Sequence, residues 1–134
     1  MRKHEDIAML QQELKGKSFT PLILDVVNEV TILNSFEIIK SKIDSKAIPP
    51  LYALVNNAGV TFYAPLELAE TKMLTSGFDV NVFGVVRMCK AFLPLLRQTA
   101  DKFGDARIVN ISSLFEYISL PSHGICTYLK QCPI

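Results

Sequence analysis

The chain has 134 residues, room for one domain, and 49% of them are hydrophobic, so the composition can supply a packed core and argues against disorder. Its net charge is +1 with Lys and Arg scattered along the sequence, which argues against a nucleic-acid-binding face. The N-terminal stretch MRKHEDIAMLQQEL carries charges of both signs, unlike a signal peptide, and no apolar run approaches the roughly 18 residues of a membrane span.

The three cysteines, Cys89, Cys126 and Cys132, form no CxxC pair. We therefore expect neither a disulfide framework nor a metal site. Free thiols suit a reducing compartment. The sequence thus predicts an intracellular protein, either cytoplasmic or held at an organelle by an N-terminal anchor of a longer form.

The predicted elements of the first half alternate between helix and strand. Residues 5–15 have the apolar spacing of an amphipathic helix, and Gly16 offers its C-cap. Residues 19–27 (FTPLILDVV) form a short apolar run that is typical of a buried parallel strand. Residues 29–43 predict a second helix, which Pro49 and the proline after it prevent from continuing.

The second half continues the alternation. Residues 51–55 predict another buried strand, residues 72–98 the longest helix, and residues 107–111 a third strand, with Pro94 as a possible kink in the helix. The apolar stripe of that helix comprises Phe78, Val82, Val85, Val86, Cys89, Phe92 and Leu96. Strands separated by helical crossovers indicate an α/β fold with a parallel sheet.

Polar and small residues follow each of the three predicted strands: Asp25–Val26, Asn56–Gly59 and Ser112–Ser113. In an open parallel sheet, ligands bind outside the carboxyl ends of the strands, so these segments are candidates for one site. The alternative is that Asn and Gly simply turn the chain after each strand.

Three stretches together resemble a known family: LYALVNNAGV, FDVNVFGVVRMCKAFLPLLR and RIVNISS. In this order and spacing they resemble the short-chain dehydrogenases/reductases over about residues 7–130, and FLPLLR and VNISS look most like the branch containing retinol, 17β-hydroxysteroid and 3-hydroxybutyrate dehydrogenases. The resemblance implies that residues 1–134 are the central segment of one such domain. That segment is a partial Rossmann-like doubly wound parallel sheet without its first two strands and its C-terminal part.

The resemblance also implies a cofactor, NAD or NADP, and residues that bind it. Asn57, Ala58 and Gly59 match the NNAG turn, which supports the central sheet and passes under the cofactor. Asp25 and Val26 match the strand end that contacts the adenine ring. For Asp25 the structural alternative is helix capping.

The implied catalytic residues are Asn81, Ser113 and Lys130. Asn81 matches the asparagine that holds a proton-relay water, and Ser113 the serine that orients the substrate oxygen; alternatively, Asn81 is a buried polar residue in a helix kink and Ser113 a capping hydroxyl. Lys130 matches the lysine of the family's Tyr-x-x-x-Lys pair and would also bind the nicotinamide ribose. The tyrosine position falls on Cys126, and Tyr128 lies out of frame with Lys130.

These departures shape the predicted function. The family's glycine-rich dinucleotide turn, Gly-x-x-x-Gly-x-Gly, does not occur in the 134 residues. We therefore expect an oxidoreductase of short-chain type, acting on an alcohol or carbonyl such as a retinol, steroid or hydroxy-acid, that is inactive as this chain stands and binds NAD(P) negligibly. The alternative is a non-catalytic interaction fragment that pairs with full-length subunits through the helix at 72–98. In the Rossmann order the strand at 19–26 lacks a neighbour and the next strand has an open edge, which predicts homo- or hetero-oligomers.

Overall fold

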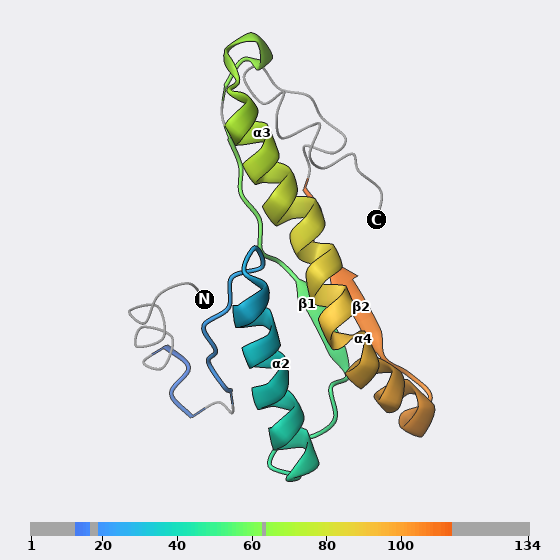
Figure 1. The fold of residues 1–134 in the computed structure, drawn as a ribbon. Coiled ribbons are helices and arrows are strands. Elements are labelled where there is room, and N and C mark those ends of the chain that lie inside the picture. The colour runs from blue at the N-terminus through green and yellow to red at the C-terminus, as the bar shows by residue number, and fades with distance from the viewer. Residues whose placement is uncertain (1–12, 17–18, 63, 114–134) are drawn as a thin grey trace.

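The computed structural model describes residues 13–16, 19–62 and 64–113 (Figure 1). Its elements in chain order are α2 (Glu29–Asp44), β1 (Ala53–Asn56), the 3₁₀-helix η1 (Leu66–Leu68), α3 (Thr71–Phe78), the π-helix η2 (Asp79–Phe83), α4 (Gly84–Phe103) and β2 (Arg107–Asn110). The helix predicted over residues 5–15 lies mostly outside the described residues, but Gly16 has the positive φ, 90°, expected of a glycine that ends a helix.

Helix α2 confirms the helix predicted at 29–43. It begins where the side chain of Asn28 accepts hydrogen bonds from the backbone N–H groups of Val30 and Thr31. Glu29 in its first turn suits the positive end of the helix dipole. The helix ends at Asp44, before the two prolines.

Strands β1 and β2 confirm the strands predicted at 51–55 and 107–111. They pair in parallel, with Ala53 opposite Arg107 and Asn56 opposite Asn110. The chain between them runs through α3, η2 and α4, so the three parts form a strand–helix–strand crossover. The strand pair is less buried than predicted, since Val55 is 56% exposed and α4 contacts the sheet from one face only (Figure 1).

The strand predicted at 19–27 is wrong. Residues 19–25 have no regular secondary structure, and a turn follows in which the N–H of Asn28 donates to the carbonyl of Asp25. A strand exists only when a neighbour completes its hydrogen bonds. In the described part of the chain the sheet consists of β1 and β2, so the apolar run has no such neighbour.

The helix predicted at 72–98 is present but longer and interrupted. Helices α3 and α4 join through the π-turn η2 into one continuous rod over residues 71–103 (Figure 1). Pro94 does not end it, because α4 continues to Phe103. Among the described residues no helix is apolar and long enough to cross a membrane.

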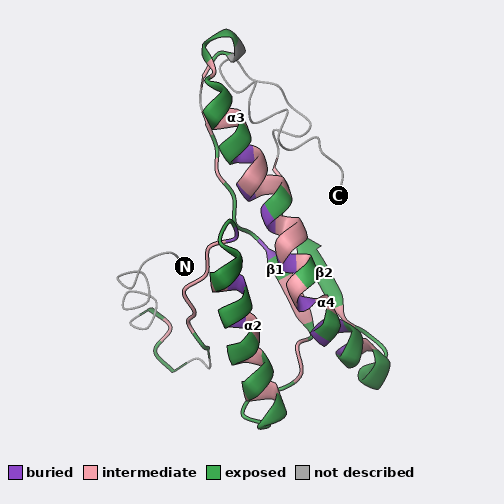
Figure 2. Ribbon diagram, in the orientation of Figure 1, coloured by how far each residue is buried: buried purple, intermediate pink, exposed green. Residues whose placement is uncertain are grey.

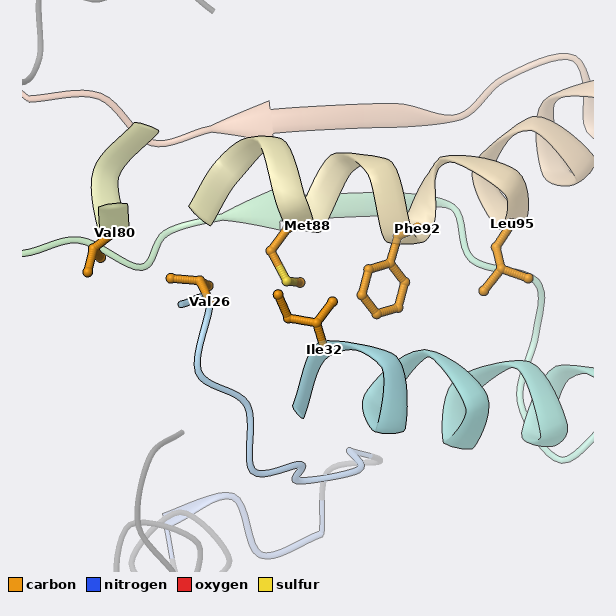
Figure 3. Close-up of a cluster of buried hydrophobic side chains, with 6 residues drawn as sticks. All are labelled: Val26, Ile32, Val80, Met88, Phe92 and Leu95. Atoms are coloured by element: carbon orange, nitrogen blue, oxygen red, sulfur yellow. The ribbon is translucent and has the colours of Figure 1, made fainter. Parts of the chain in front are cut away.

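The core lies between α2, α4 and the segment before α2 (Figures 2 and 3). Its buried members are Val26, Ile32, Val80, Met88, Phe92 and Leu95. Phe36 packs edge-to-face on Phe92, with ring centroids 5.9 Å apart. Of the predicted apolar stripe only Phe92 and Leu96 are buried, because the flank with Val85 and Cys89 meets a sheet only two strands wide.

Candidate cofactor and substrate site

The carboxyl ends of β1 and β2 border a shallow hollow of about 220 Å³. It is lined by Asn57, Gly59, Val60, Thr61, Ile111, Ser112 and Ser113. The structure therefore brings together the NNAG turn and the Ser-Ser pair, which are far apart in the sequence. All of these lining side chains are neutral amides, hydroxyls or small apolar groups. Such a surface offers neutral hydrogen-bonding groups beside small apolar ones.

Asn81 fixes the segment that follows the NNAG turn. Its amide donates to the carbonyl of Val60 at 2.9 Å and accepts from the N–H of Val60 at 2.9 Å. Asn81 lies in η2, where the π-turn turns this side chain out of the regular helical pattern. Asn81 is half-buried in a π-turn, whereas the structural alternative expected a buried polar residue in a helix kink, and its role in proton relay stays a prediction.

The segment with Asp25 and Val26 is held by Thr31. The Thr31 hydroxyl donates to the carbonyls of Asp25 and Asn28, at 3.0 and 2.8 Å, and accepts from the N–H of Asp25 at 3.0 Å. The Asp25 carboxylate accepts from the N–H of Val27 at 3.1 Å. Asp25 therefore shapes its own turn, and the capping interpretation is wrong because Asn28 caps α2.

Val26 joins the turn at Asp25 to the rest of the described core and to the cavity beside β1. It is 8% exposed, and with Ala58 it borders a cavity of about 120 Å³ beside β1 and α4. A Cβ on Gly84 would lie 2.7 Å from a methyl group of Val26, so glycine is what lets α4 approach this turn. The sequence motif N-V-x-G contained this signal, although it gave Gly84 no role.

A partly buried amide pair, with Asn56 buried and Asn110 exposed, crosses the sheet at its carboxyl end. Asn56 donates from Nδ2 to Oδ1 of Asn110 at 2.9 Å and lies 3.5 Å from Sγ of Cys89. Asn56 is 9% exposed, so the pair satisfies polar groups that would otherwise be costly. Sequence reasoning did not assign this pair. The signal was an asparagine at the end of each strand, in V-N-N and V-N-I.

The amino ends of the two strands carry a charged cluster instead. Tyr52 donates to Asp105 at 2.8 Å, and Arg107 donates to the same carboxylate oxygen at 3.2 and 3.0 Å. The hydrogen bond from Arg107 lowers the pKa of Asp105, while the hydrogen bond to Asp105 raises the pKa of Tyr52. All three residues are exposed.

Three positions of interest, Cys126, Tyr128 and Lys130, lie outside the described residues. The described part of the chain holds no group of three or more His, Cys, Asp or Glu that could bind a metal ion. The predicted site residues that the structure gathers around the hollow and the adjoining cavity are therefore Val26, Asn57, Ala58, Gly59 and Ser113.

The described geometry is that of a partial α/β fold, a parallel strand–helix–strand unit with a hollow at the carboxyl ends of its strands, where ligands bind in open parallel sheets. The family profile described as short chain dehydrogenase matches residues 1–128, and the chain belongs to this family.

Its relatives include the 3-ketodihydrosphingosine reductase of Bacteroides thetaiotaomicron, 35% identical over 109 residues, and retinol dehydrogenase 7 of Mus musculus, 30% identical over 118 residues. These alignments cover 81% and 86% of this chain but 37% and 35% of the relatives, so the chain spans about a third of their length.

Solved structures show the same fold. The gluconate 5-dehydrogenase of Burkholderia cenocepacia, in complex with NADP and tartrate, superposes with a TM-score of 0.75 at 22% identity, covering 98% of this chain and 49% of that one. Serine dehydrogenase from Escherichia coli gives a TM-score of 0.73 at 24% identity, covering 97% and 56%. The predicted partial Rossmann-like fold is thereby confirmed.

Proposed function

We propose that this chain supplies the central part of the NAD(P)- and substrate-binding site of an oxidoreductase that acts on an alcohol or carbonyl. The observation that carries the proposal is the convergence of the NNAG turn and the Ser-Ser pair on one hollow, with Val60 between them anchored by Asn81. NAD(P), when bound, accepts or donates the hydride.

The residues of this chain would bind the cofactor, orient the substrate and shield both from water. The Ser113 hydroxyl would hold the substrate oxygen, and the exposed Asn57–Gly59 turn would lie under the nicotinamide-ribose. Lys130 would bind that ribose. Asp25 and Val26 would form the adenine end, where buried Val26 offers an apolar wall and Asp25 shapes the turn beside it.

The substrate class we propose is a retinol, steroid or hydroxy-acid-like alcohol or ketone. The names of the relatives support the retinol and hydroxy-acid members, and the steroid member rests on the sequence resemblance. We also propose that these 134 residues alone are inactive, because Cys126 occupies the position of the acid/base tyrosine. A thiol side chain is too short to reach the same oxygen. An intracellular location and a single-domain assignment belong to the same proposal.

A chimera tests the proposed function. Residues 19–113 would replace the matching segment of the D-beta-hydroxybutyrate dehydrogenase of Bos taurus, a relative 32% identical over 101 residues. We expect the chimera to bind NADH or NADPH and to turn over. As the matched control, Ser113→Ala in the chimera should keep cofactor binding and lower kcat by about 100-fold. A folded chimera that binds neither cofactor would contradict the proposal.

A second candidate function is non-catalytic pairing with full-length subunits through the helix over residues 71–103. It is favoured by Phe83, a large apolar side chain that is 53% exposed on this helix. Light scattering of the chain mixed with a full-length relative would detect the complex. Phe83→Asp should abolish it, and unchanged pairing by this variant would reject the helix as the contact surface.

A further inference from the structure

Arg87 has a set of contacts that the roles above do not use. Its Nη2 lies 2.6 Å from Oδ1 of Asp79, and its Nη1 donates to the carbonyl of Asp79 at 3.2 Å and to the carbonyl of Val26 at 3.4 Å. Its Nε lies 3.9 Å from Oε1 of Glu29. One guanidinium thus touches η2, the turn at Val26 and the first turn of α2.

These contacts explain how the π-turn is stabilised. The carbonyl of Asp79 accepts from the N–H of Gly84, five residues on, and Arg87 fills its remaining lone pair. The side chain of Arg87 is 27% exposed, so its pair with Asp79 is partly shielded from water. Hydrogen bonds of a charged donor under such shielding are among the stronger ones in proteins.

The π-turn is also the segment that anchors the opposite side of the site. Asn81 lies within it and holds Val60 by two hydrogen bonds, while Arg87 reaches from the next turn to Val26. The helix therefore contacts both ends of the proposed groove: the adenine end through Arg87 and the nicotinamide end through Asn81.

We propose that Arg87 is a positioning residue, which sets the place of the Val26 turn relative to the Asn81–Val60 anchor and so shapes the adenine end of the cofactor groove. This inference rests on the proposed function. Arginine is required because one planar group donates in several directions at once. A lysine could keep the ion pair with Asp79 but could not also reach Val26.

Amide hydrogen exchange of the 134-residue chain tests the inference without any cofactor. In Arg87→Met we expect exchange at Val27 and Thr31, in the Val26 turn and the first turn of α2, to be about tenfold faster, with faster exchange at Val60 as well. In Arg87→Lys only Val27 and Thr31 should change. The N–H of Arg107, which donates to Tyr52 at the far end of the sheet, should keep its wild-type rate in both.

The matched control is Arg97→Met. Arg97 is exposed on the same helix and forms no hydrogen bond or ion pair with the described residues, so all four amides should exchange as in the wild type. Equal acceleration at all four amides in Arg87→Met would indicate general destabilisation and overturn the inference. Wild-type exchange at Val27 and Thr31 would overturn it as well.

A ligand titration distinguishes a role of Arg87 in positioning the adenine end of the site from a role in stabilising the fold alone. Adenosine monophosphate and nicotinamide mononucleotide would be added at millimolar concentrations while amide chemical shifts are followed. Arg87→Lys should weaken binding of the adenosine probe by about tenfold and leave that of the nicotinamide probe unchanged. Equal affinities in Arg87→Lys and wild type would overturn the positioning role. If neither probe shifts the wild-type spectrum, the 134 residues alone do not bind the probes, and the two affinities are compared in the chimera, where equal adenosine binding by Arg87→Lys overturns the positioning role. A folded chimera that binds neither cofactor contradicts the proposed function, and the exchange pattern then still decides whether Arg87 sets the turn.

Discussion

The two ends of the β1–β2 pair are held together by different physical means. At the carboxyl end, neutral amides and backbone groups are fixed by partly buried hydrogen bonds, from η2 to Val60 in the pair Asn81–Val60 and between the two strands in the pair Asn56–Asn110. At the amino end, Tyr52 and Asp105 meet in water with no such cover. Exposed ionic contacts contribute little, whereas contacts sheltered by packing resist change. The end with the candidate site is thus the more rigidly specified one.

The largest effect should come from closing the space at Gly84. Gly84→Ala places a Cβ 2.7 Å from a methyl group of Val26, and we expect a loss of about 3 kcal/mol in unfolding free energy despite the better helix propensity of alanine. Denaturant melts measure the loss. In a Val26→Ala background the same substitution should cost much less, and an undiminished cost would refute the steric explanation.

Removing the Asn81 anchor should have the next largest effect. Asn81→Ala leaves the N–H and carbonyl of Val60 without their partner, at a cost of about 2 kcal/mol, and should speed amide exchange at Val60. Asn81→Asp should cost nearly as much, since a carboxylate cannot donate to the carbonyl. Asn34→Ala, at an exposed position of α2, is the control and should be near neutral.

A smaller effect is expected near the amino end, at Gly104. This residue ends α4 with a φ of 83° in open space, so Gly104→Ala meets no atom but adopts a strained backbone. We expect a cost of about 1 kcal/mol by thermal melting. Comparison with Gly84→Ala separates conformational strain from steric overlap. Val26→Ala should reduce the stability cost of Gly84→Ala and leave the cost of Gly104→Ala unchanged. A reduced cost of Gly104→Ala would show that the two sites are coupled.

The smallest effect should come from the exposed cluster and depend on pH. The folded-state pKa of Asp105 is lowered from 3.8, so its contribution is present above that value and is lost as pH falls through the folded pKa. The pKa of Tyr52 is raised from 10.0, so its contribution is present below 10.0 and is lost as pH rises through the folded pKa.

Melting curves compared across pH test both directions. The difference between wild type and Asp105→Asn should shrink at the acidic and the alkaline extremes, and Tyr52→Phe should remove only the alkaline change. A wild-type minus Asp105→Asn difference that is flat from pH 3 to 11 would contradict this assignment.

Local sequence signals predicted much of the fold. The spacing of apolar residues located α2, and runs of β-formers located β1 and β2, because these signals depend on neighbours along the chain. The run at 19–27 has the same composition but no paired strand among the described residues, so composition alone misassigned it. The buried face of the long helix was misplaced within α4, where Gly84 and Met88 are buried and Val85 and Cys89 are only half-buried against a sheet two strands wide.

The candidate site was predicted from the motifs of a family resemblance more than from the physical properties of its residues. Asn57, Gly59 and Ser113 were named from the family resemblance, and the structure brings them to one hollow. Arg87 was missed because tertiary packing brings it to the carbonyl of Val26, and Thr31 was missed because its contacts depend on the turn at Asp25–Asn28, where a strand was expected. An arginine or threonine within an amphipathic helix has no sequence pattern that predicts hydrogen bonds to backbone groups outside the helix.

The parallel pairing of β1 with β2 has a consequence for how the chain folds. Asn56 and Asn110 are hydrogen-bonded across 54 positions of sequence, so the pair can form only after a long loop has closed, at a considerable entropic cost. Much of that loop is the rod of α3, η2 and α4, whose contacts are local and form early. When the helical rod has already formed, fewer backbone bonds of the loop are free to rotate, so closing the loop costs less entropy. The rate of strand pairing should therefore follow the stability of this helix, and the hollow at the strand ends should be among the last features of the molecule to appear.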